Sequence, residues 1–426
     1  MNIAPTIKSI KSIKPIKSIY VYLYTFFKWT VISAFVGLAG GLVGVLFHKS
    51  VEYATGFREQ NPWLIWLLPA GGLVIVLFYK VSKIKKDVGT NEIISCIRSD
   101  EKVPAALAPL IFVSTVITHL FGGSAGRESA ALQIGGTIGY HSGRLFRLDE
   151  KDTHLIVLCG MSAVFSALFG TPLTAAIFAM EVVSVGVIYY SGLVPCLFSS
   201  LVAYWMSLLF GAQPARFALK VIPEISFMNI LRVIMLAALC AAVSIIFCVA
   251  LHKTHTLLEK LIKNDYLRIA AGGFAMIALT YLLGTYDYNG AGMDLIARAV
   301  NGEAKPEAFL LKILFTAITI GAGYKGGEIV PTFFIGATFG CAAGGLLGLD
   351  AGFGAAVGIA ALFCGVVNCP VTSVFLSIEL FGAEGVVLFM IACAVTNLLS
   401  GNYGLYKTQK IIYSKLKAEF INVFAK

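Results

Sequence analysis

Residues 126–139 read GRESAALQIGGTIG and residues 327–340 read GEIVPTFFIGATFG, so a glycine-rich stretch recurs 201 positions later in the chain. The second parts of the two stretches are the most alike: residues 134–139 read IGGTIG, and residues 335–340 read IGATFG. Self-similarity at a fixed, long offset is typical of an internal duplication. The sequence therefore predicts two related halves.

Further blocks extend the duplication in both directions. Residues 89–93 (GTNEI) begin 37 positions before the first stretch, and residues 290–294 (GAGMD) begin 37 positions before the second. Later, residues 172–181 run from Pro-Leu-Thr to a glutamate, and residues 370–379 run from Pro-Val-Thr to a glutamate at the same spacing. Duplicated transmembrane halves often fold with inverted topology and place the substrate site near the bilayer midplane, where broken helices meet.

The composition indicates a polytopic membrane protein. Hydrophobic residues make up 58% of the chain and charged residues 13%, and the mean hydropathy is +0.84; soluble domains carry roughly 25% charged residues. Because a membrane-spanning helix needs about 20 mostly apolar residues, several of the apolar runs are short for a simple span and favour tilted or broken helices. The main runs are residues 31–47, 63–78, 107–121, 233–251, 354–367 and 386–399.

The net charge of +10 is distributed as expected for an inner-membrane protein. Basic residues gather between the apolar runs, which follows the positive-inside rule and predicts that both termini face the cytoplasm. We expect no cleaved signal peptide, because the first basic stretch precedes a long apolar run that has no small-residue cleavage site. We also expect no nucleic-acid binding, because no basic patch belongs to a soluble fold. The clusters are Lys8 to Lys17; Lys80, Lys83, Lys85 and Lys86; Arg144, Arg147 and Lys151; Lys253, Lys260 and Lys263; and Lys407, Lys410, Lys415 and Lys417.

The glycine-rich joints are suited to a small anion. A helix that begins inside the membrane points its free N–H groups and the positive end of its dipole at whatever lies beyond it. Such a site holds an anion without a full positive charge, which would bind too tightly for release. Glu128 is a carboxylate within such an apolar stretch. Because burying a carboxylate there is costly, Glu128 is a candidate functional residue.

In their order and spacing, these blocks resemble the CLC family of chloride channels and anion/proton antiporters. The family forms G-S-G-I-P, G-R-E-G-P and G-x-F-x-P correspond to residues 89–93, 126–130 and 327–331, and a tyrosine follows near the end. The likeness runs from about residue 25 to residue 420. It implies an all-α fold of about 18 tilted and broken helices in two inverted repeats, about 25–215 and 226–420, after a basic cytoplasmic segment 1–20. It also implies a homodimer with one pathway in each subunit.

The resemblance assigns roles to residues of this chain. Glu128 would be the gating glutamate that competes with the anion and carries protons. Tyr406, at the beginning of the last helix, would give its hydroxyl to the anion. Glu328 would act in selectivity or coupling. The remaining predicted anion-binding residues are Thr90, Asn91, Gly126, Arg127, Ile329 and Val330.

Departures from the chloride pattern resemble the fluoride-exporting branch of the family. Glu328 stands in the third motif, Asn91 and Glu92 alter the first, and Val182 occupies the position of a glutamate that many chloride/proton antiporters use as a proton relay. Thr90 keeps the hydroxyl of a chloride-type protein. We predict fluoride/proton antiport; the alternatives are a chloride channel, a chloride/proton antiporter and a passive fluoride channel.

Several residues have plainer interpretations. Glu128 could pair with the adjacent Arg127, although neighbours one residue apart do not face each other on a helix. Glu328 could be a solvated carboxylate near Lys325, and Tyr403 is an alternative to Tyr406. The matching Glu181 and Glu379 are more readily explained as structural residues than as transport residues.

We predict no cofactor, no metal site and no enzymatic activity. Residues 122–126 match G-x-S-x-G, and residues 321–326 match G-x-G-x-x-G, but neither lies in the strand–turn–helix context that its chemistry requires. The six histidines are scattered without metal-ligand spacing. The nine cysteines include no C-x-x-C pair, so packing explains them.

Overall fold

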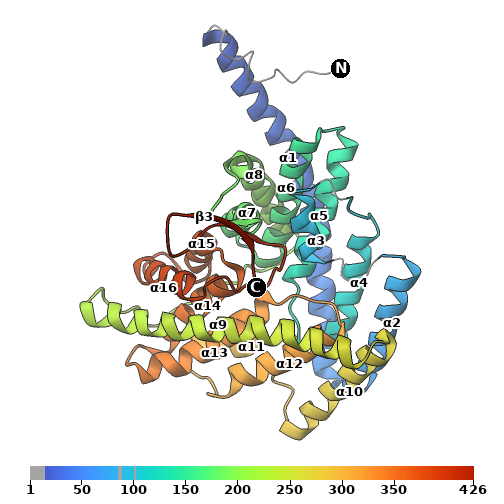
Figure 1. The fold of residues 1–426 in the computed structure, drawn as a ribbon, viewed down its shortest axis with the longest axis vertical. Coiled ribbons are helices and arrows are strands. Elements are labelled where there is room, and N and C mark those ends of the chain that lie inside the picture. Colours follow the sequence, from blue (N-terminus) through green and yellow to red (C-terminus); the bar gives the residue numbers. More distant parts are fainter. Residues whose placement is uncertain (1–14, 85–88, 100–101) are drawn as a thin grey trace.

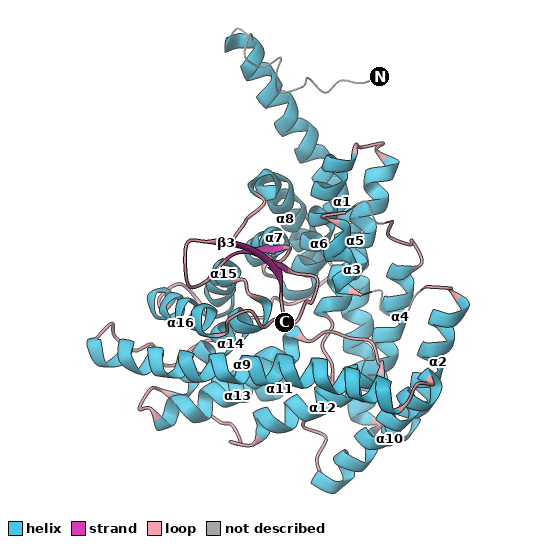
Figure 2. Ribbon diagram, viewed as in Figure 1, coloured by secondary structure: helices cyan, strands magenta, loops and turns pink. Residues whose placement is uncertain are grey.

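The structure is a computed structural model that describes residues 15–84, 89–99 and 102–426. Most of the predicted basic segment 1–20 lies outside these residues, as do Lys85 and Lys86. The described chain is built almost entirely of helices (Figure 1 and Figure 2), and the beginning of α1 projects away from the rest of the molecule.

The first half of the chain contains α1 to α8 and two short 3₁₀ helices. Their bounds are α1 Pro15–Gln60, η2 Pro62–Leu67, α2 Leu68–Val81, α3 Thr90–Cys96, α4 Leu107–Leu120, α5 Glu128–Leu145, α6 Glu150–Phe169, α7 Pro172–Glu181, η3 Tyr190–Gly192 and α8 Leu193–Leu209. The second half contains α9 Phe227–Leu261, α10 Asp265–Leu283, α11 Met293–Val300, α12 Ala308–Ala322, α13 Ile329–Leu346, α14 Ala351–Val367, α15 Pro370–Phe381 and α16 Val386–Leu399.

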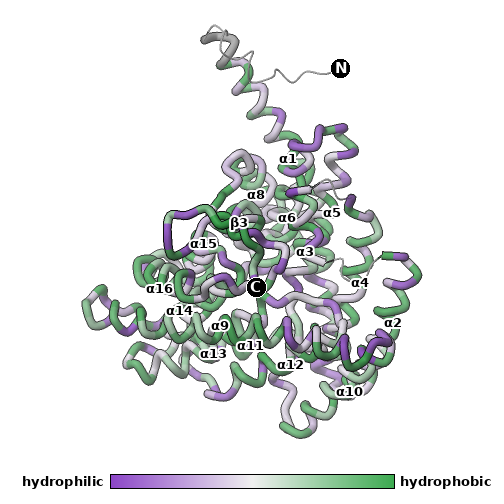
Figure 3. Tube along the Cα trace, in the orientation of Figure 1, coloured by the Kyte–Doolittle hydropathy of each residue, from purple (hydrophilic) through white to green (hydrophobic). Residues whose placement is uncertain are grey.

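Seven helices of the described residues are long and apolar enough to cross a membrane, and others are apolar but have only 10–17 residues. Hydrophobic residues make up most of the helices, and hydrophilic residues lie mainly in the connections between them (Figure 3). Large apolar side chains such as Trp205, Leu209 and Leu282 are exposed on the outside of the molecule, which suits contact with lipid. The predicted all-α membrane fold is confirmed, and the helices are indeed broken and of unequal length.

Two of the breaks occupy matching positions in the duplicated sequence. Helix α4 ends at Leu120 and is followed by Gly122 with φ +86°, and α12 ends at Ala322 and is followed by Gly323 with φ +111°. A left-handed glycine ends an α-helix at little cost, because it has no side chain to clash with the backbone. After each glycine, a few extended residues lead to the start of α5 or α13.

Close helix packing is also repeated in the two halves. Gly135 of α5 faces Gly160 of α6 so closely that a Cβ on Gly160 would collide with the Gly135 carbonyl, and Gly336 of α13 faces Gly358 of α14 in the same way. Small residues allow helix backbones to approach within a membrane protein, where packing rather than the hydrophobic effect joins helices. These pairs pack α5 closely against α6 and α13 closely against α14.

Helices α7 and α15 cap each other. The Glu181 carboxylate, near the end of α7, accepts hydrogen bonds from the backbone amides of Val371 (3.1 Å) and Thr372 (2.8 Å) at the start of α15. The Glu379 carboxylate of α15 accepts two equivalent bonds from the start of α7. Carboxylates at helix N-termini satisfy free N–H groups and complement the dipole. These contacts support the structural interpretation of both glutamates.

The chain after α16 does not form the last helix that we expected. Tyr406 lies in a turn, followed by strands β2 Lys410–Tyr413 and β3 Phe420–Phe424. Strand β2 pairs antiparallel with β3 and parallel with the short strand β1 Ser184–Val185, which gives a three-stranded sheet. The β-branched and aromatic residues of both strands explain this outcome, because they fit a pleated surface better than a helix.

Candidate anion site

The centre of the site is a backbone pairing between the two halves. The amide of Gly126 donates to the carbonyl of Gly327 (2.6 Å), and the amide of Gly327 donates to the carbonyl of Gly126 (2.7 Å). Gly126 leads into α5 and Gly327 into α13, so the two helix starts lie side by side. A Cβ on Gly327 would lie 2.7 Å from both the amide nitrogen and a carboxylate oxygen of Glu128. Glycine is therefore needed here for a close approach of the backbone.

The Glu128 carboxylate lies among the free amides of both helix starts. One of its oxygens accepts a hydrogen bond from the amide of Val330 (3.1 Å), and the amides of Arg127 and of Glu128 itself lie beside it. The side chain is fully buried, and its other oxygen has no hydrogen-bond partner among the described residues. The carboxylate thus occupies the position in which backbone N–H groups would hold an anion.

A second carboxylate, that of Glu328, lies next to this position. The Ser129 hydroxyl donates to it over 2.5 Å, and the Glu328 carboxylate interacts electrostatically with that of Glu128. The Tyr406 hydroxyl lies near Ser129, but it has no hydrogen-bond partner of normal geometry within the described part of the chain. Because Tyr406 is buried, this hydroxyl is a donor available to a small anion.

Helix α3 closes the site from a third direction. The Thr90 hydroxyl donates to the backbone carbonyl of Ser129 (3.2 Å), and the Gln133 amide group contacts Thr90 (3.4 Å). The Asn91 side chain is turned to Thr408, accepting from its amide (3.2 Å) and its hydroxyl (3.1 Å). Asn91 therefore positions the turn that carries Tyr406, and its side-chain carbonyl accepts hydrogen bonds from Thr408.

The turn that carries Tyr406 is held by buried polar groups. The Gln409 side chain donates to the carbonyls of Val182 and Val367 (2.9 Å each), which lie at the ends of α7 and α14. The Lys415 ammonium donates to Asn368 (2.5 Å) and Ser400 (3.2 Å), beside the ends of α14 and α16. Burial lowers the pKa of Lys415 to about 8, which is still above neutral pH. The ammonium therefore keeps its positive charge and complements the two helix C-termini.

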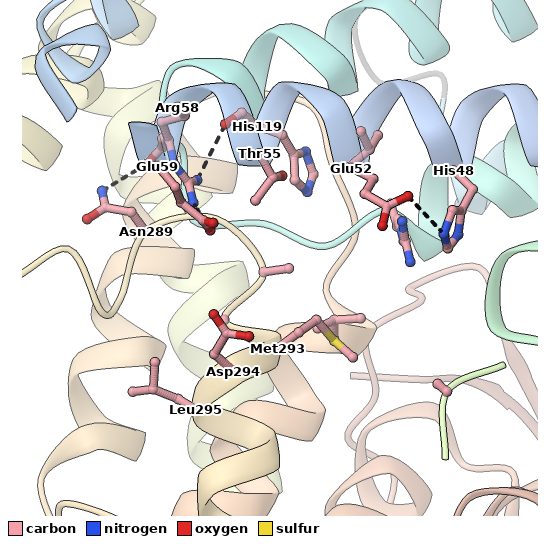
Figure 4. Close-up of a pocket in the computed structure, with 18 of the residues that line it drawn as sticks. His48, Glu52, Thr55, Arg58, Glu59, His119, Asn289, Met293, Asp294 and Leu295 are labelled. Carbon is pink, nitrogen blue, oxygen red and sulfur yellow. Dashed lines mark hydrogen bonds and ion pairs between the residues drawn. The ribbon is translucent and has the colours of Figure 1, made fainter. Parts of the chain in front are cut away.

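A cavity of about 720 Å³, called the outer cavity below, approaches the site from the side where α1 ends. Its wall includes Arg127, which precedes Glu128 in the chain, and Val330, whose amide donates to the Glu128 carboxylate. Figure 4 shows His48, Glu52 and Arg58 of α1 facing the chain around Asn289 and Asp294. Arg127 lies in this wall and interacts electrostatically with both Glu128 and Glu52. Arg127 thus adds positive potential at the mouth of the site.

Most of the residues singled out in the sequence lie together. Glu128, Glu328, Thr90, Gly126, Val330 and Tyr406 meet at the facing ends of α3, α5 and α13, with Ile329 as the first residue of α13. Ser129 was missed, although the family motif has glycine at this position and a hydroxyl there was a visible signal. Gln409 was also missed, because only folding brings its side chain into contact with the carbonyl of Val182, which is distant in the sequence.

Comparisons with known proteins agree with this geometry. The family model described as "Voltage gated chloride channel" matches residues 71–401. A chloride/fluoride channel protein of Pseudomonas syringae is 35% identical over 91% of this chain and 87% of its own length. An H⁺/Cl⁻ exchange transporter of Vibrio campbellii is 25% identical over 88% of each chain.

Two solved structures share the fold. A CLC-type fluoride/proton antiporter superposes with a TM-score of 0.87 at 31% identity, covering 90% of this chain and 98% of the other. A slow cyanobacterial Cl⁻/H⁺ antiporter superposes with a TM-score of 0.76 at 20% identity, covering 87% and 94%. With its paired helix starts, buried Glu128 carboxylate and match over most of its length, this chain belongs to the CLC family of anion and proton transporters.

Proposed function

We propose that the protein is a fluoride/proton antiporter that exports fluoride across the cell membrane in exchange for inward-moving protons. The observation that carries this proposal is the position of the Glu128 carboxylate, which accepts a hydrogen bond from the Val330 amide at the start of α13. A fluoride ion needs the same N–H donors, so the carboxylate and the anion compete for one position.

This competition couples the two ions. When Glu128 takes up a proton from the outer cavity, it loses its charge and with it most of its affinity for the helix amides. An anion then replaces it. When the anion leaves outward, Glu128 releases its proton toward the inside and returns to the amides. Each exchange moves one type of ion against the other, and the proton gradient drives fluoride out.

Glu328 supports the choice of fluoride. A carboxylate near an anion site repels every anion unless a proton is shared between them. Fluoride is the most basic halide and forms the strongest hydrogen bond to a carboxylic acid, whereas chloride gains much less from the same donor. The greater identity to proteins described with fluoride, 35% and 31%, than to the Vibrio chloride exchanger, 25%, points the same way.

A passive fluoride channel is the second candidate, and Val182 favours it. The Val182 side chain is apolar and buried, and its carbonyl is covered by Gln409. A proton passing inward from Glu128 therefore needs another acceptor. Glu328, a carboxylate that interacts electrostatically with Glu128, is the candidate that we propose. We further propose that two copies form a homodimer with one pathway each.

The test uses protein reconstituted in liposomes that are loaded with fluoride and clamped electrically at mildly alkaline pH. We expect fluoride efflux to drive proton uptake against a pH gradient. We also expect the rate of chloride efflux to be at most about one tenth of the rate of fluoride efflux. Protein-free liposomes control for the permeation of hydrogen fluoride. Fluoride efflux without proton uptake would establish a channel instead, and equal rates for the two anions would exclude fluoride selectivity.

A further inference from the structure

A second cavity, of about 370 Å³, shares no lining residue with the outer cavity. It lies where the ends of α2, α9 and α12 meet the start of α10. Apolar residues of α2 form one wall, including Ile75 and Val76, and Ala322 closes another. The anion site described above uses none of these residues.

Cations dominate the lining of this cavity. Lys80, Lys83, Arg268 and Lys325 contribute to it, and Asp265 is the one carboxylate among its described lining residues. Asp265 is already paired with Arg268, whose guanidinium donates to it over 3.0 Å. Lys325 interacts electrostatically with Glu328, so Lys80 and Lys83 are the cations whose charge is not balanced by an acidic residue among the described residues of the cavity wall.

Two buried polar groups in the same wall have no hydrogen-bond partner among the residues that the structure describes. They are the Tyr79 hydroxyl and the Nε–H of Arg268, and these side chains are only 4% and 7% exposed. Leaving a buried donor unsatisfied costs about 1–3 kcal/mol, and such groups in a native structure require an explanation. A ligand with several acceptor oxygens would satisfy both.

Lys80 and Lys325 also lie over aromatic rings, which keeps their ammonium groups at this cavity. The Lys325 nitrogen is 4.6 Å from the centre of the Tyr79 ring, and the Lys80 nitrogen is 5.5 Å from that of Tyr266. Aromatic faces attract cations without neutralising them. The arrangement therefore presents ordered cations to an anion that carries phosphate-like oxygens.

We propose that this cavity binds the phosphate-ester headgroup of an anionic phospholipid. The helices around it turn apolar side chains outward, with Leu77 and Val81 of α2 and Leu267 of α10 exposed, so acyl chains can lie beside the headgroup. The basic residues at these helix ends place the cavity on the cytoplasmic face by the positive-inside rule. Basic pockets between transmembrane helices on that face suit anionic lipid headgroups.

The test titrates phosphatidylglycerol into the full-length protein in non-ionic detergent and follows the midpoint of thermal unfolding, because a ligand that binds the folded state stabilises it. Phosphatidylcholine, inorganic phosphate and glycerol 3-phosphate are the comparison ligands. The main variant is Lys80→Gln/Lys83→Gln, in which both residues are exposed. The control is Lys260→Gln/Lys263→Gln, which removes the same charge from exposed residues outside the cavity.

We expect phosphatidylglycerol alone to raise the midpoint. The Lys80→Gln/Lys83→Gln variant should need about 25-fold more of it, since each lysine near an anionic headgroup contributes roughly fivefold in affinity. The control should match the wild type, and Tyr79→Phe should weaken binding a fewfold without changing charge. Equal effects of phosphatidylcholine, or equal loss in both lysine pairs, would overturn the proposal. Protection by the soluble phosphates as strong as that by lipid would show a soluble-anion site and would also overturn it.

Discussion

Replacing Glu128 with glutamine is expected to abolish proton-coupled transport while fluoride still crosses the membrane. Glutamine is nearly the same shape as the protonated acid but cannot ionise, so it neither carries a proton nor competes as an anion for the Val330 amide. In proteoliposomes, we expect proton uptake driven by fluoride to fall at least about a hundredfold, because the carboxylate that takes up and releases the proton is gone. Fluoride efflux should persist as a leak.

The control for this experiment is Glu52→Gln. Glu52 lines the same outer cavity and interacts electrostatically with Arg127, but it does not accept a hydrogen bond from the helix amides that surround Glu128. Its replacement therefore removes an equal charge without removing the gate. We expect Glu52→Gln to change transport less than about threefold, as for a partly screened charge. A Glu128→Gln protein that still moves protons against their gradient would exclude Glu128 as the proton carrier.

Replacing Glu328 with glutamine is expected to reduce the preference for fluoride over chloride by about tenfold, which corresponds to about 1.4 kcal/mol. The reason is that a carboxylic acid donates a stronger hydrogen bond to a basic anion than an amide does. The Ser129 hydroxyl, which donates to the Glu328 carboxyl group over 2.5 Å, can donate to the glutamine carbonyl instead. The measurement is the ratio of initial efflux rates for the two anions.

Two further variants locate the cause of this effect. Ser129→Ala removes the hydroxyl and keeps the Glu328 carboxylate, so it should retain most of the selectivity if the carboxylate provides it. Glu303→Gln removes a charge from an exposed residue and should change nothing. If Glu328→Gln kept the wild-type preference, Glu328 would have no part in selecting the anion.

The duplication allowed much of the site to be predicted from the sequence. The offset of 201 residues relates Gly122 to Gly323 and Gly126 to Gly327, and in the structure the first pair ends helices and the second pair joins the halves. Glycine-rich breaks in apolar stretches carry this information locally. The resemblance then placed Glu128, Glu328 and Tyr406, which meet as expected.

Other features depend on contacts between distant segments. Asn91 was assigned to the anion, but its side chain binds Thr408, more than 300 positions away. The turn around Tyr406 was expected to begin a helix, and instead it leads into β2, which pairs with Ser184 and Val185. No local pattern shows that a strand partner will be available, so hydrophobic residues near the end of a membrane protein favoured the helix.

Isothermal titration of fluoride into the purified wild-type protein and the Glu128→Gln variant tests most directly whether carboxylate and anion compete for the amides of α5 and α13. Removing a charged competitor from a buried hydrogen bond frees about 1.5–3 kcal/mol, so the variant should bind fluoride at least about tenfold more tightly than the wild type. Equal affinity in the two proteins would contradict the account, because the anion would then be bound somewhere that the Glu128 side chain does not occupy.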